Sequence, residues 1–116
     1  MTQRQDEFTV IPRENLGKIL TYEITTMDIK DSFNDGETKT IGVIEFKVKY
    51  DLFPEIIKTI RLFCSLTEYK QKAFNHSTKI ARLMTLYGCR TLEELKTQPV
   101  KLRENDESGF VEFSLN

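Results

Sequence analysis

Two runs of alternating residues constrain the fold more than any other feature of this chain. Residues 40–50 and residues 58–66 (KTIRLFCSL) each place an apolar side chain at every second position. A period of two is typical of a β-strand with one buried and one exposed face. Pro54 lies between the runs and cannot continue a paired strand. The sequence therefore predicts two strands joined by a loop. Their inward residues are Ile44, Phe46, Val48, Tyr50, Ile60, Leu62, Cys64 and Leu66.

Three further strands are predicted around this pair. Residues 18–30 form a long first strand whose apolar residues change phase across Thr25-Thr26. One extra residue moves every later side chain to the other face, so a β-bulge or bend is expected there. The tract 31–39 (DSFNDGETK) is predicted to be a turn. The last two strands are predicted at residues 100–103 and 109–115.

Between the third and fourth strands the apolar period changes from two to 3.6 residues. Ile80, Leu83, Met84 and Tyr87 lie at i, i+3, i+4 and i+7, which is one stripe of an amphipathic helix. A second, very short helix is predicted from Thr91, because the residues that follow it have the spacing of a capping box.

The element order is three strands, a helix and two strands. This order, with a bent first strand, predicts a β-rich α+β fold: a five-stranded OB-like Greek-key barrel with a helix between strands 3 and 4. An α+β sandwich with the same order stays open. Residues 1–16 are polar apart from Phe8, Val10 and Ile11 and are predicted to be an N-terminal arm. Residues 17–116 are predicted to be one barrel domain.

Charge is distributed unevenly along the chain. The formal net charge of −1 argues against a protein that binds nucleic acid by bulk charge alone. Residues 37–103, however, carry 13 Lys and Arg against 7 Asp and Glu, while the remainder carries 4 against 11. A basic middle can focus an anionic ligand on one face. Chance scatter in a small chain is the alternative explanation.

No residues have the spacing of a catalytic or metal site. His76 lies in a polar turn without a cysteine or carboxylate at ligand spacing. Cys64 and Cys89 are too few for a disulfide scaffold, and the five glycines are isolated, which excludes a glycine-rich phosphate loop. We therefore expect no enzymatic activity, no metal and no cofactor. The chain has no signal-like or membrane-spanning apolar stretch, so we expect a cytoplasmic protein.

The outward faces of the second and third strands form the best candidate site. An exposed aromatic ring can stack on a base, and neighbouring cations can contact phosphates, so we expect single-stranded DNA to bind there. Alternatively, Phe63 is covered by the N-terminal arm or by a second copy of the chain, and the lysines are solvated charges. The candidate residues, including two on the fourth strand, are Lys47, Lys49, Arg61, Phe63, Lys101 and Arg103.

Four segments carry a resemblance to a known family: IRLFCSL, the helix that ends in LYG, TLEELKTQPVKLR and the closing strand. Through them the chain resembles small phage-encoded single-stranded-DNA-binding proteins with an OB fold. The resemblance covers residues 17–116. It implies coating of single-stranded DNA in phage or plasmid replication or recombination, within a bacterial host cell. Many such proteins end in a flexible acidic tail, which this chain lacks.

A second function stays open. Compact phage proteins of this size and charge also inhibit host enzymes, including nucleases and CRISPR effectors. In that case Leu52 and Phe53, predicted to be exposed on the loop before the third strand, would contact a host or phage replication or defence protein. Open strand edges also allow pairing of two copies, so monomer and homodimer both stay open.

Overall fold

The computed structural model describes residues 12–31, 33 and 35–115. The apolar residues of the expected arm (Phe8, Val10 and Ile11) lie outside the described residues. Within the described part, the chain forms five strands and three helices. These are β1 (Glu14–Asp31), β2 (Glu37–Tyr50), β3 (Ile57–Ser65), α1 (Leu66–Gln71), α2 (Lys79–Leu86), α3 (Leu92–Lys96), β4 (Val100–Glu104) and β5 (Val111–Phe113).

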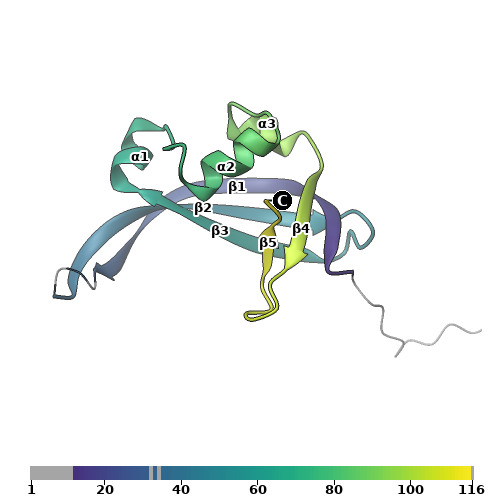
Figure 1. Cartoon of the computed structure of the whole chain (residues 1–116), viewed down its shortest axis with the longest axis horizontal. Helices are drawn as coiled ribbons and strands as arrows, with labels where there is room; N and C mark the ends of the chain where they lie inside the picture. Colours follow the sequence, from purple (N-terminus) through teal and green to yellow (C-terminus); the bar gives the residue numbers. More distant parts are fainter. Residues whose placement is uncertain (1–11, 32, 34, 116) are drawn as a thin grey trace, which may run out of the picture.

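The strands form a single antiparallel sheet in the order β3-β2-β1-β4-β5. The predicted β-rich α+β class is therefore confirmed. The sheet is not closed, because in the described residues the edge strands β3 and β5 lie near each other without forming a ladder. Figure 1 shows the three helices, all between β3 and β4 in the chain, gathered on one side of the sheet.

β1 is the longest strand and serves two partners. It pairs with β2 from Gly17 to Asp31 and with β4 from Glu14 to Gly17. The strand therefore begins earlier than predicted, and residues 14–16 belong to the sheet. The outer half of the β1–β2 hairpin extends beyond the body of the molecule (Figure 1).

The predicted bulge across Thr25-Thr26 is wrong, because the register shift lies between Ile19 and Thr21. The buried residues before the shift are Asn15, Gly17 and Ile19, of which only Ile19 is apolar. Hydrophobicity therefore does not mark the inward phase of this segment. Beyond the shift, Ile24 and Met27 are both exposed, since the hairpin extends past the core there.

The core lies between the inner face of the sheet and the helices. Ile44, Phe46, Val48 and Tyr50 of β2 are all buried, as predicted from their alternation. The rings of Phe46 and Phe113 meet edge to face with centroids 5.1 Å apart, which links β2 to β5 across the core. The helices contribute the buried side chains Ile80, Leu83, Leu92 and Leu95.

Short local signals define the helices. Thr78 and Thr91 cap α2 and α3, and each hydroxyl accepts a hydrogen bond from the backbone N–H three residues later. Ser65 and Glu68 form a reciprocal capping box at the start of α1. Gly88 follows α2 with φ of 65°, as expected of a glycine beyond a helix end.

Candidate nucleic-acid interface

Phe63 and Arg61 lie on the outward face of β3, as the sequence predicted. Phe63 is 53% exposed and is paired across the ladder with Val43 of β2. Arg61 is exposed and is paired with Glu45. An aromatic ring and a guanidinium therefore stand two residues apart on one open sheet surface.

Glu45 partly neutralises this surface. Its carboxylate lies 2.9 Å from Arg61 Nε and 3.8 Å from Lys47 Nζ. Lys47 also donates a hydrogen bond of 2.6 Å to Thr59 Oγ1 on β3. These pairs hold the two cations over the centre of the face. The side chains of Arg61 and Lys47 remain 59% and 46% exposed, so each can still reach a phosphate.

Further lysines continue the face across β1 to β4. Lys49 is paired with Lys18 of β1, and Lys101 of β4 is paired with Leu16, two residues before Lys18 on the same face. None of Lys18, Lys49 and Lys101 has an ion-pair partner among the described residues. We call the set Lys47, Lys49, Lys18 and Lys101 the basic band.

Lys18 was missed in the sequence because the bulge was misplaced. Lys18, Leu20 and Tyr22 are two residues apart, so a regular strand would point all three to one face. The register shift after Ile19 instead separates Lys18 from the inward-facing Tyr22. No pattern in the sequence marked this phase, because Asn15 and Gly17 are buried without being apolar, while Leu16 and Lys18 face outward.

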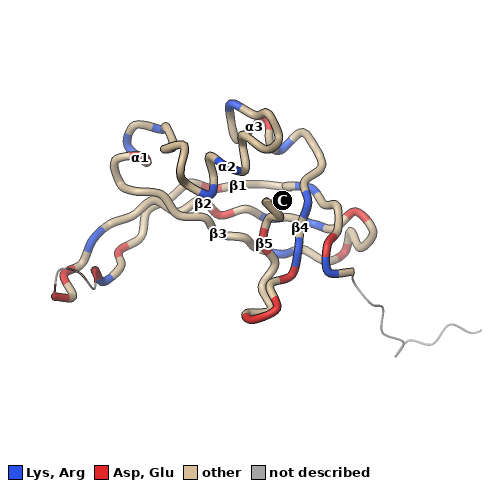
Figure 2. The backbone as a smooth tube through the Cα atoms, viewed as in Figure 1, with Lys and Arg blue, Asp and Glu red and all other residues tan. Residues whose placement is uncertain are grey.

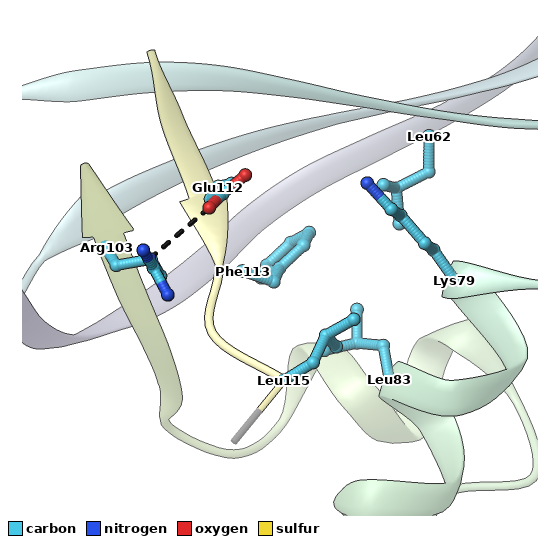
Figure 3. Close-up of a pocket in the computed structure, with 7 residues that line it drawn as sticks. All are labelled: Leu62, Lys79, Leu83, Arg103, Glu112, Phe113 and Leu115. Atoms are coloured by element: carbon cyan, nitrogen blue, oxygen red, sulfur yellow. Dashed lines mark ion pairs between the residues drawn. The ribbon is translucent and has the colours of Figure 1, made fainter. Parts of the chain in front are cut away.

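Arg103 does not belong to the basic band. Its Nε atom lies 3.3 Å from a carboxylate oxygen of Glu112 on β5, and the two strands are paired at these residues. Figure 3 shows Arg103 and Glu112 at one side of a small cavity of about 170 Å³ near Phe113 and Lys79. The cavity lies at the seam where β3 and β5 fail to pair. The structure thus ties Arg103 to β5, apart from Lys47 and Arg61.

Of the two residues predicted to be exposed on the loop before β3, one is exposed. Leu52 is 72% exposed, whereas Phe53 is partly buried and packs against the core cluster. The prediction that Phe53 is exposed is therefore wrong. The Phe53 ring, next to Pro54, turns back onto the core, and the local sequence pattern does not reveal this packing.

Two other exposed aromatic residues were not predicted. Phe33 lies in the β1–β2 turn, and Phe110 precedes β5, out of phase with buried Val111 and Phe113. Figure 2 shows acidic positions in the β4–β5 turn, where the sequence has Asp106 and Glu107, and Phe110 follows this turn in the chain. Arg13 pairs with Asp106, but Glu107 has no ion-pair partner among the described residues and repels phosphate, so Phe110 is a poorer base-stacking residue than Phe63.

Burial lowers the reactivity of the two cysteine thiols. Burial raises the pKa of the Cys64 thiol, and nearby Glu68 adds to the effect. Burial also raises the pKa of Cys89, with a contribution from Glu94. Both cysteines are therefore poor nucleophiles at neutral pH. Across the described ranges, no group of three or more His, Cys, Asp and Glu side chains could hold a metal ion.

No helix in the described part of the chain is long and apolar enough to cross a membrane. No protein-family model, curated protein or solved structure matches this chain.

Proposed function

We propose that this protein binds single-stranded DNA, without catalysis, on the outward face of β2 and β3. The observation that carries the proposal is the exposed ring of Phe63 on the same open face as Arg61 and the basic band. Single strands bind through successive bases stacked on aromatic rings, with the backbone held by cations. The resemblance to phage proteins supports a role in replication or recombination.

The strand order supports the same proposal. In an OB barrel, the first strand pairs with the second and fourth, and the ligand crosses the face of the second and third strands. The order β3-β2-β1-β4-β5 has these neighbours, with β3 and β5 as the two edges that such a barrel would bring together. An OB-like barrel with an open seam is our proposal for the fold.

The basic band makes the salt dependence of binding calculable. If its four lysines each neutralise one phosphate of a single strand, the slope of log K against log salt is about −3. A rise in salt from about 50 to 200 mM would then weaken binding roughly fiftyfold. A protein that bound through apolar contacts alone would show little change.

The test is fluorescence anisotropy with a labelled oligo-dT at these two salt concentrations. Phe63→Ala should weaken binding by about five- to 150-fold, since stacking of a base contributes about 1–3 kcal/mol. Phe110→Ala is the matched control, because it removes an exposed ring from the acidic turn and should leave affinity nearly unchanged. Absence of binding at the lower salt would refute the proposal.

Thermal unfolding separates the functional effect of Phe63→Ala from a structural one. The ring is about half exposed, so its removal should lower stability by about 1 kcal/mol, against about 3–5 kcal/mol for the buried Phe46→Ala. If both variants unfold at equally low temperatures, Phe63 belongs to the core and the outward face is assigned wrongly.

A protein-interaction module that inhibits a host enzyme is the second candidate. It is favoured by Leu52, a large apolar side chain left 72% exposed on the loop before β3. Retention of one host enzyme on the immobilised protein, lost in Leu52→Asp, would support this function, particularly if oligo-dT does not bind.

A further inference from the structure

β1 has a long open edge. The strand pairs with β4 over Glu14–Gly17 and with β2 from Gly17 onward, so both of its edges are paired at Gly17. From Thr21 to Asp31 it pairs with β2 only, and no other described strand lies against its second edge. Every second residue there presents a backbone N–H and C=O group to that edge. Such an edge can accept another strand.

A groove runs beside this edge. It has a volume of about 910 Å³ and lies between β1 and the three helical segments. Its apolar lining includes Ile24 of β1, Tyr69 of α1 and Met84 of α2, together with Phe74 from the segment between the two helices. Ile24 is 42% exposed although it lies on the inner face of the sheet, opposite Ile44. At Tyr22 and Ile24 the edge thus adjoins a largely apolar depression that can accept side chains of an added strand.

The charges at the groove identify its occupant. Lys72 and Arg90 line it, and neither has an ion-pair partner among the described residues. The acidic residue of the lining is Glu68, whose carboxylate already accepts hydrogen bonds from the backbone N–H groups of Asn75 (2.7 Å) and Ser65 (3.1 Å). The lining therefore sets the two cations Lys72 and Arg90 against one carboxylate, that of Glu68, and its charge balance is positive.

A hydrogen bond between β1 and α3 closes one end of the groove. Tyr22 donates a 2.9 Å hydrogen bond to Glu93 of α3, which joins β1 to the helical layer. Beyond Tyr22 the groove meets β1 at Ile24, and the open edge continues from there toward the hairpin tip. We therefore place the added strand from Ile24 onward.

We propose that the open edge of β1 and this groove bind an extended acidic peptide of a partner protein by β-strand addition. The peptide pairs with the β1 backbone beyond Tyr22. Its apolar side chains, at alternate positions, enter the groove beside Ile24, and its carboxylates face Lys72 and Arg90. The site lies on the opposite face of β1 from the basic band, so the peptide and single-stranded DNA need not compete.

The probe is the fluorescein-labelled heptapeptide EIDFDIE, measured by anisotropy, with KIKFKIK as the charge-reversed control. EIDFDIE should bind and KIKFKIK should not. A version of EIDFDIE with N-methyl groups at alternate backbone positions should lose binding, because it cannot pair with the edge. Absence of EIDFDIE binding, or equal binding of KIKFKIK, would overturn the proposal.

Two residues of β1 provide a matched pair of variants. Ile24 and Met27 are each 42% exposed, but they lie on opposite faces of the strand. Ile24→Ser should weaken EIDFDIE binding about tenfold or more, whereas Met27→Ser should change it by less than about twofold. Equal losses in both variants would place the peptide elsewhere. The double variant Lys72→Gln and Arg90→Gln should weaken binding and reduce its salt dependence.

Hydrogen exchange gives a readout independent of affinity. Bound EIDFDIE should protect alternate backbone amides between Ile24 and Asp31, because the second edge of β1 becomes paired. Protection confined to backbone amides of β2 and β3, or no protection at all, would contradict strand addition. Phe63→Ala should bind the peptide normally, which separates this site from the DNA-binding one.

Discussion

Replacing Gly42 by alanine should destabilise the protein because β2, β3 and α1 converge at this glycine. A Cβ atom built on Gly42 would lie 2.5 Å from Cys64 Sγ on β3 and 3.1 Å from Tyr69 Cβ on α1. The first separation is about 0.9 Å short of ordinary van der Waals contact, which begins near 3.4 Å. Cys64 is buried, so its sulfur has little room to move away.

The magnitude follows from two opposing terms. Overfilling a packed site costs about 1–3 kcal/mol, while replacing glycine by alanine in a strand gains about 0.5–1 kcal/mol. Because the overlap with the buried sulfur is large, the upper part of the cost applies, about 2–3 kcal/mol. The net loss for Gly42→Ala should then be about 1–2.5 kcal/mol, measured by urea unfolding with an unchanged m-value. Gly42→Ala should also loosen α1, since the contact with Tyr69 lies next to the helix backbone.

A second background tests the cause. In Cys64→Ala the sulfur is absent, so adding Gly42→Ala should cost about 1 kcal/mol less than it does in the native chain. The contact with Tyr69 Cβ remains, so some penalty should persist. A Gly42→Ala variant as stable as the native protein would refute this packing argument, and so would an equal penalty in both backgrounds.

Two predictions concern pH. Hydrogen bonds from the backbone N–H groups of Asn75 and then Ser65 lower the pKa of Glu68. The ionised Glu68 carboxylate therefore stabilises the fold above about pH 4.5, its unperturbed pKa, and this stabilisation is lost as the pH falls further. Glu68→Gln should show a smaller acid-induced loss of unfolding free energy. An equal loss in the variant and the native protein would contradict this role of Glu68. Because burial raises the pKa of Cys64 and Cys89, native thiols should react with iodoacetamide at about pH 8 far more slowly than thiols in urea. Stability should also fall as the pH rises above about 9, where the unfolded thiols ionise, and less so in the double alanine variant; rapid native labelling would contradict the burial.

Most of the fold could be predicted where a local pattern coincides with burial. The inward residues of β2, the outward Phe63 and Arg61, the α2 stripe and the cap at Thr91 all follow from spacing that the final structure preserves. The prediction failed where burial and hydrophobicity diverge. Asn15 and Gly17 are buried without being apolar, and Ile24 and Met27 are apolar without being buried.

The candidate site also has features that the sequence predicts and features that it does not. Sequence alternation was sufficient to put Lys47, Arg61 and Phe63 on one side of their strands, because each strand has its own period. It could not show that Glu45 is shared by Arg61 and Lys47, since the ion pair with Arg61 joins residues on different strands. Nor could it show that Lys18 links Lys49 to Lys101, because that link depends on the position of a bulge.

The sequence by itself determined the phases of β2 and β3, the apolar stripe of α2 and the cap at Thr91, because these depend on neighbours within a few residues. Tertiary structure decided which strands are neighbours, which edges stay open and which cations lie together. Those properties arise from pairing between distant segments. The sheet order, the basic band and the groove beside β1 all depend on such pairing, and they carry the two proposed binding sites.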